Sequence, residues 1–384
     1  MQGLHKKQLK QLKALRKKLH QHAEISDHEK MTADIIANWF TPLHPDQIIE
    51  KLGGYGLAFV YEGQKSGKTV LLRCELDALP IHETTKVSYQ SSTPGVSHSC
   101  GHDGHMAILS SLGVLFSQQR PESGRIILLY QPAEETGQGA RRILRDKKFR
   151  SLKPDLVFAL HNLPGYPLGQ VLIRKDTFYC ASTGIVITLK GRTSHAAHPE
   201  NGISPGFAVS ELISALPRLS LKKELKNIYS LITITHVTIG ERSLGIAPGD
   251  AVIMAALRAE SDADLHMIAK LTEAHVHNTA DMHSLQCYIS WSETFPATVN
   301  HAQACDIIEH SASECGYSLR HLHTPLKVSE DFGEFTARYP GAILGIGSGE
   351  NHPQLYNPGF DFPDRLIDIG CNMFMNIINK GVQS

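Results

Sequence analysis

The chain has 384 residues, of which 41% are hydrophobic and 20% are charged. This composition is typical of an ordinary globular protein that is too long for a single hydrophobic core. Lysine plus arginine and aspartate plus glutamate number 38 each. The charge balance therefore gives no indication of nucleic acid or a membrane surface as a partner, and it favours a small-molecule substrate.

The first residues and the cysteines indicate the compartment. The sequence begins MQGLHKKQLK, without the apolar core of a secretory signal, and it holds no run of about 18 apolar residues. Seven cysteines, an odd number, are scattered along the chain. We therefore expect a cytosolic protein without structural disulfides.

A basic amphipathic helix is predicted near the start of the chain. Leucines recur at spacings of three and four among lysines and arginines, at Leu9, Leu12, Leu15 and Leu19. Either this stripe packs on the core or the helix lies on a membrane surface. We favour packing on the core, because one such helix without a second anchor holds a membrane weakly.

Residues 56–180 alternate between two kinds of segment. Short apolar runs rich in β-branched residues, LAFVY, TVLLRCEL, RIILLY and DLVFAL, are separated by helical patterns such as GHMAILSSLGVLF. The alternation predicts an α/β fold with a mainly parallel sheet covered by helices. Functional residues are then expected at the carboxyl ends of those strands.

The pattern changes between residues 181 and 292, where strand, helix, strand, strand, helix and strand follow one another. This order is the split βαβ arrangement of a ferredoxin-like domain. A strand, AILGIG, and a helix, DRLIDIGCNMFMNIINK, then complete the chain. We predict a discontinuous first domain, 1–180 and 293–384, and an inserted α+β domain, 181–292.

The densest cluster of metal-capable side chains is SHSCGHDGH, which contains Cys100 and His102. The Cys-x-His spacing in a glycine-broken loop lets a thiolate and an imidazole reach one ion. These donors suit zinc, cobalt, nickel or manganese better than magnesium or calcium.

Two further elements stand at strand ends. QPAEETGQGA, with Glu134 and Glu135, follows RIILLY, and His161 follows DLVFAL. Neighbouring side chains on extended backbone point in opposite directions, so one glutamate is expected to bind metal and the other to handle a proton. Each element alone would be read as a polar loop, but three elements at three strand ends together predict a metal site.

Five stretches carry a resemblance to a known family: GVSHSCGHDGHMAIL, LLYQPAEETGQGA, LHNLPG, GRTSHAAHPENGISP and SEDFGEF. Their sequences and their order along the chain resemble those of the family of two-metal aminoacylases and carboxypeptidases. The chain looks like the amidohydrolase branch, which includes N-acyl amino acid amidohydrolases, hippurate hydrolases and auxin-conjugate hydrolases. The resemblance implies hydrolysis of a small N-acylated substrate with two divalent ions per chain, Zn, Mn, Co or Ni.

The resemblance also implies roles for individual residues. Four positions match the family's metal ligands: Cys100, His102, Glu135 and His161. Glu134 matches the general base, Asp77 the aspartate behind the ligands, Arg258 a substrate-binding arginine, and His195 a substrate-reaching histidine on the inserted domain. That inserted domain is expected to act as a lid and to carry a homodimer contact.

The sequence departs from the family near its end. The stretch QLYNPGFDF has Tyr356 where an L-H-N-P motif would supply the last metal ligand, and a neutral phenol is a poor ligand. His352, four residues upstream, is the alternative ligand, and Tyr356 is then a substrate contact. A second reading therefore stays open: a weakly active or non-catalytic relative that binds small amides or peptides.

Two competing motifs are rejected on chemical grounds. The stretch Gly202–Gly206 fits G-x-S-x-G, but Pro205 has no N–H to donate to an oxyanion. GQKSGKT resembles a phosphate-binding loop, yet it is one residue short and leads into a strand instead of a helix.

Overall fold

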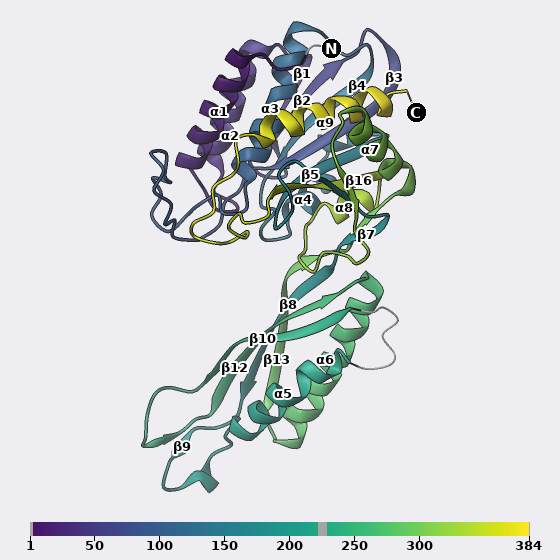
Figure 1. The fold of residues 1–384 in the computed structure, drawn as a ribbon. Helices are drawn as coiled ribbons and strands as arrows, with labels where there is room; N and C mark the ends of the chain where they lie inside the picture. Colours follow the sequence, from purple (N-terminus) through teal and green to yellow (C-terminus); the bar gives the residue numbers. More distant parts are fainter. Residues whose placement is uncertain (1–2, 222–228, 384) are drawn as a thin grey trace. The chain divides into compact units, whose positions relative to one another are not determined.

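The computed structural model describes residues 3–221 and 229–383. The chain divides into two compact units (Figure 1). Unit 1 comprises Met1–Phe178, Thr298–Thr324 and Glu330–Ser384, and unit 2 comprises Tyr179–Ala297 and Pro325–Ser329. Unit 2 is thus inserted in the sequence of unit 1, and a short later segment also belongs to it.

Unit 1 is built on an eight-stranded sheet with the order β1-β2-β4-β3-β5-β16-β6-β15. Its four central strands, β4, β3, β5 and β16, are parallel neighbours, whereas β1, β2 and β6 join antiparallel to the strand beside them. The outermost strand β15 is parallel to β6. The predicted mainly parallel α/β sheet is therefore confirmed, with three antiparallel pairings that the sequence did not indicate. The strands are β1 (Gln47–Leu52), β2 (Gly56–Glu62), β3 (Lys65–Glu75), β4 (Ser123–Gln131), β5 (Leu156–Pro164), β6 (Val171–Ile173), β15 (Leu319–His321) and β16 (Gly341–Gly349).

Both faces of the sheet are buried at its inner strands, which explains the unbroken apolar runs in β2, β4, β5 and β16. In β2, Leu57, Phe59 and Tyr61 belong to the main core, while Ala58 and Val60 on the opposite face are also fully buried. Helix α3 packs against both α1 and α9 (Figure 1). The helices of unit 1 are α1 (Lys6–Gln21), α2 (Lys30–Phe40), α3 (His102–Gln118), α4 (Gly139–Arg145), α7 (Ala302–Glu314), α8 (Gly333–Thr336) and α9 (Leu366–Gly381).

The basic amphipathic helix predicted near the start is α1. Leu12, Leu15 and Leu19 are buried in the main core of unit 1, and Leu9 packs against it. The leucine stripe is therefore covered by protein, which is the alternative that we favoured over a position on a membrane surface. Across residues 3–221 and 229–383, every helix is too short or too polar to cross a lipid bilayer.

Unit 2 has the ferredoxin-like arrangement that the sequence predicts. Its elements run β8, α5, β10, β12, α6 and β13, and its antiparallel sheet has the order β10-β12-β8-β13. Residues of both helices and of the sheet share one apolar core. The bounds are β8 (Ala181–Lys190), α5 (Gly206–Leu219), β10 (Ser230–Ile239), β12 (Asp250–Ala259), α6 (Asp262–Met282) and β13 (Gln286–Phe295).

Short elements complete the fold. Two small ladders pair β9 (Ser194–His195) with β11 (Ile246–Ala247) and β7 (Asp176–Tyr179) with β14 (Thr298–Asn300). All seven cysteines are free thiols.

Candidate metal centre

Three neighbouring parallel strands of unit 1 deliver polar side chains to one edge of the sheet. Strand β3 ends at Glu75 and is followed by Asp77, while β4 is followed by the turn that carries Glu134 and Glu135. His161 lies inside β5, three residues before the strand ends. The carboxyl edge of the sheet is where α/β folds assemble their sites.

The loop that carries Cys100 reaches this edge through a glycine. Gly101 has φ +91°, and a Cβ at this position would lie 2.4 Å from Oδ1 of Asn162. Only glycine fits this close approach without strain. The chain therefore turns sharply after Cys100, and His102 begins helix α3.

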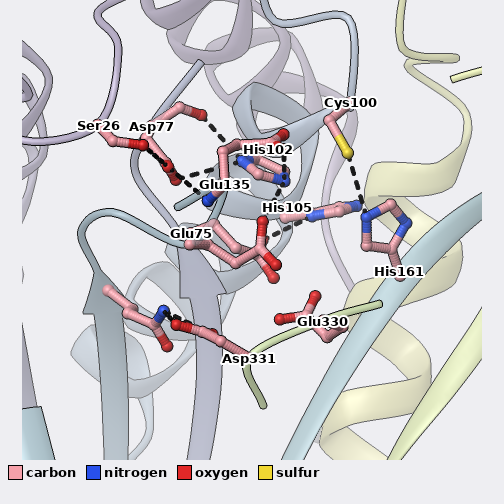
Figure 2. A network of polar contacts seen from close by, with 12 residues as sticks. Ser26, Glu75, Asp77, Cys100, His102, His105, Glu135, His161, Glu330 and Asp331 are labelled. Carbon is pink, nitrogen blue, oxygen red and sulfur yellow. Dashed lines mark hydrogen bonds and ion pairs between the residues drawn. The ribbon is translucent and has the colours of Figure 1, made fainter. Parts of the chain in front are cut away.

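Cys100, His102 and His161 converge in the buried interior (Figure 2), with potential ligand atoms within 4.8 Å of one another. The Sγ of Cys100 lies 3.4 Å from Nε2 of His161. The Nδ1 atoms of His102 and His161 each lie 2.8 Å from a backbone carbonyl oxygen, that of Asp77 and that of Asn162. Since a carbonyl only accepts, both Nδ1 atoms carry a proton, so Nε2 is the nitrogen of each ring that could bind a cation.

Glu134 and Glu135 lie in a turn instead of on extended backbone, so the premise that they must face opposite ways is wrong. Ala133, just before them, has φ +50°. A carboxylate oxygen of each glutamate lies 3.9 Å from Nε2 of His102. Their other neighbours differ, however: Glu134 groups with Glu330 and Asp331, and Glu135 accepts from Tyr356.

A buried arginine stands beneath these acids and was missed by the sequence reasoning. Arg73, in β3, is fully buried and pairs with Glu75, with Glu330 at 2.8 Å and with Asp331 at 2.7 Å. The available signal was a cation within the otherwise apolar run TVLLRCEL, because a buried strand tolerates an arginine only when acids surround it.

Asp77 holds the site from behind. Its Oδ2 accepts from Oγ of Ser26 at 2.7 Å and from the backbone N–H of Glu135 at 2.9 Å (Figure 2). Its own carbonyl oxygen orients His102. One residue thus fixes a histidine and the turn that carries a glutamate, which is how residues behind metal ligands set ligand direction.

The burial of so many acids shapes the electrostatics. Burial, with the repulsion of Glu330, Glu135 and Asp331, raises the pKa of Glu134 well above its usual value. Burial likewise raises the pKa of the Cys100 thiol to about 12, and the Glu135 carboxylate adds to this shift. Burial lowers the pKa of His161 to about 3, and His105 adds to that shift. A cation placed here would favour the charged forms of the acids and the thiol.

The residues present fit a divalent metal ion. Among the residues that the structure describes, three buried polar atoms of this cluster make no hydrogen bond: Nε2 of His102, Oε1 of Glu135 and Oδ1 of Asp77. Leaving such atoms unpaired is costly, and a bound cation would satisfy at least the first two. A donor set of sulfur, imidazole nitrogen and carboxylate oxygen suits a transition metal.

The remaining predicted residues lie in different surroundings. His352 has its Nε2 2.9 Å from the carbonyl oxygen of Asp361, and in the described ranges it joins no ligand group. Tyr356 is half exposed, and its hydroxyl donates to Oε2 of Glu135 at 2.6 Å. In unit 2, Arg258 donates to the Lys327 carbonyl and to Ser329.

His195, also in unit 2, is exposed on β9. Its Nδ1 lies 3.0 Å from the backbone N–H of Ala197 and accepts from it, so its ring proton sits on Nε2.

Residues 71–380 match the family model described as Peptidase family M20/M25/M40. The chain belongs to this family. The predicted resemblance to metal-dependent amidohydrolases is therefore confirmed, and so is the prediction of an enzyme of that class.

Relatives with described activities align over nearly their whole length. The chain is 28% identical to a hippurate hydrolase of Campylobacter jejuni, covering 95% of each sequence. It is 24% identical to an N-acetylcysteine deacetylase of Bacillus subtilis, covering 94% of each. Among solved structures, it resembles a dinuclear metal-binding peptidase of Bacillus subtilis, with a TM-score of 0.82, 23% identity and 99% of each chain covered. This last similarity supports the same fold.

Proposed function

We propose that the protein hydrolyses the amide bond of a small N-acyl amino acid, with metal held by Cys100, His102, His161 and Glu135. The observation that carries this proposal is the convergence of a thiol and two imidazoles, within 4.8 Å of one another, beside two buried carboxylates. The relatives named for hippurate and N-acetylcysteine support the substrate class.

Each residue has a defined task in the proposed reaction. Bound divalent ions would polarise the scissile carbonyl and activate the attacking water. Glu134 takes the proton of that water and delivers it to the leaving amine. Asp77 keeps His102 and the Glu135 turn in place through its contacts with both. Arg73 balances the acids around Glu134, since it pairs with Glu330 and Asp331.

The first experiment combines a substrate panel with one substitution. Purified protein is assayed with N-acetyl and N-benzoyl amino acids, then treated with a chelator and reloaded with zinc, manganese, cobalt or nickel. Glu134→Gln should keep its metal content but lose roughly 10²–10⁴-fold in kcat, the usual contribution of a general base.

The matched control is Glu122→Gln, at an exposed glutamate paired with Lys65, which should keep full turnover. Retained activity in Glu134→Gln would show that Glu134 is not the general base. Activity that survives the chelator would show that hydrolysis does not require the metal.

His195 is proposed to stabilise the developing oxyanion. Because its Nδ1 accepts from Ala197, its Nε2–H is a hydrogen-bond donor, which this task requires. His195→Ala should lower kcat by roughly 10²-fold, as loss of one oxyanion donor does, while the metal content stays constant. An unchanged kcat would assign His195 a different role.

A non-catalytic binder is the second candidate, and Tyr356 favours it because its hydroxyl occupies an oxygen of Glu135. The substrate panel separates the two candidates. Product release supports the enzyme, whereas saturable binding of N-acetyl amino acids without product supports the binder.

A cytosolic location and a homodimer through unit 2 are further proposals. Cell fractionation tests the location, and light scattering of the full chain tests the homodimer.

A further inference from the structure

His102 belongs to three groups of ligand-capable side chains. In the group with Glu75 and His105, both ring nitrogens of His105 already contact Glu75 and Asn162, which leaves two unequal sets for metal. The first set holds three strong donors, namely the sulfur of Cys100 and the Nε2 atoms of His102 and His161. Backbone carbonyls orient both rings through Nδ1, so Nε2 is the nitrogen that each ring turns toward the Cys100 sulfur and the carboxylates. Three preset donors are the number that zinc sites commonly take from protein.

The second set joins the same histidine to two glutamates, His102 with Glu134 and Glu135. An imidazole nitrogen has one lone pair, so Nε2 of His102 cannot serve two ions at once. When the first set takes His102, the second position keeps the two carboxylates. Glu134 also groups with Glu330 and Asp331, whereas Glu135 interacts with Cys100 of the first set.

Tyr356 already occupies that carboxylate. Its hydroxyl donates to Oε2 of Glu135 at 2.6 Å, while Oε1 of the same group makes no hydrogen bond among the described residues. The backbone holds the tyrosine there, since its N–H donates to the carbonyl of Ser99 at 2.9 Å and its φ is +64°. The backbone bond to Ser99, the residue before Cys100, thus holds the phenol in place on Glu135.

We propose that the two metal positions are unequal: the chain holds one ion tightly at Cys100, His102 and His161, and Tyr356 makes the position beside Glu135 weak. A phenol oxygen is a poorer ligand than an imidazole nitrogen, and the O–H that Tyr356 donates to Oε2 of Glu135 competes with a cation for that carboxylate. Loss of residues behind metal ligands typically costs 10–100-fold in affinity, so replacing a ligand itself should cost at least about 100-fold. This inference rests on the proposed function and deepens it.

The test counts ions in the full-length protein. Wild type, Tyr356→His and Tyr356→Phe are loaded with excess zinc, dialysed against the same metal-free buffer and analysed for zinc and protein. Wild type and Tyr356→Phe should retain one ion per chain, and Tyr356→His should retain two. In a zinc titration, the second ion should bind wild type at least about 100-fold more weakly than the first.

Cobalt(II) provides a readout that does not depend on turnover. The thiolate-to-cobalt charge-transfer band should saturate at one equivalent in wild type, because Cys100 belongs to the tight position. Cys100→Ser should abolish that band. In Tyr356→His, a second equivalent should change the ligand-field bands further, and in wild type it should change them only at high cobalt concentration.

The outcomes separate this inference from the proposed function. Two ions of similar affinity in wild type would overturn the inference and leave the hydrolase intact. A Tyr356→His protein that melts like wild type but still retains one ion would also overturn it. A wild-type chain that retains no ion and hydrolyses nothing would overturn both. The wild-type count stands as a test even if Tyr356→His fails to fold.

Discussion

Asp77 shows how much of the site depends on one side chain that is not itself expected to bind metal. Its carboxylate accepts from Ser26 and from the backbone of Glu135, and its carbonyl orients His102. Asp77→Asn replaces one acceptor oxygen with an NH₂ group, so the contact with the Glu135 N–H is weakened or lost. We expect a 10–100-fold loss in zinc affinity, measured by competition with a chromogenic chelator.

Ser26→Ala is the matched control for Asp77→Asn, because it removes one donor to the same oxygen and leaves the Glu135 contact in place. It should reduce zinc affinity far less. Equal losses in the two variants would contradict the view that Asp77 acts by holding the Glu135 turn.

At the residue scale, sequence reasoning found the side chains with distinctive chemistry. Cys100, His102 and His161 were predicted together, and the structure brings them within 4.8 Å. Arg73 and Glu330 were missed, because an arginine in a strand and a glutamate in a loop are ordinary until the fold places them together. Pairings across 257 residues of sequence are set by tertiary packing, and local patterns do not encode them.

At the scale of elements, helix α3 depends on the glycine before it. Gly101 has φ +91°, and an added Cβ would lie 2.4 Å from Oδ1 of Asn162, the atom 2.6 Å from Nε2 of His105. Gly101→Ala should therefore cost about 1–2 kcal/mol of backbone strain and also displace Asn162. Urea unfolding and zinc titration should both show a loss.

Gly95→Ala provides the control, because Gly95 has φ +75° but nothing lies within 4 Å of its added Cβ. It should carry the backbone strain alone and leave zinc affinity near that of wild type. Equal losses of zinc affinity in both variants would contradict the view that the close approach of Gly101 to Asn162 positions α3.

The elements themselves were largely predictable, and the turn between β4 and α4 was not. The apolar runs of β2, β3, β4, β5 and β16 are long enough to be read from composition, because both sheet faces are buried. The turn at Glu134 depends on Ala133 at φ +50°, whose N–H donates to Glu29 at 2.8 Å. A distant carboxylate that stabilises an unfavourable backbone angle leaves no trace in the local sequence.

At the scale of unit 1, a buried charge network joins the first helix to distant segments. His20 of α1 lies 2.8 Å from Asp103 and 3.2 Å from Glu83. Burial alone would lower the pKa of His20, but Asp103 and then Glu83 outweigh it and raise the pKa to about 9. Protonated His20 therefore stabilises the fold fully below pH 6.5, and this contribution is lost as the pH rises through about 9.

The expected size of this effect is about 3 kcal/mol between pH 6.5 and 9.5. His20→Gln should flatten the fall in unfolding free energy over that window, measured by urea denaturation at each pH. His323→Gln, at an exposed histidine, is the control and should follow wild type. A His20→Gln profile that still falls as steeply as wild type would assign the alkaline loss to other groups.

The position of β16 has a consequence for how the chain is made. This strand lies between β5 and β6 in the sheet of unit 1, yet it is synthesised only after all of unit 2. Until the ribosome has passed Gly349, β5 presents an unpaired backbone edge, and Arg73 lacks Glu330 and Asp331 until shortly before that point. Most of unit 2 has been synthesised long before then, so we expect unit 2 to fold first during translation. The part of unit 1 that precedes it stays incompletely folded until β16 is made, and it exposes a strand edge that chaperones would have to cover.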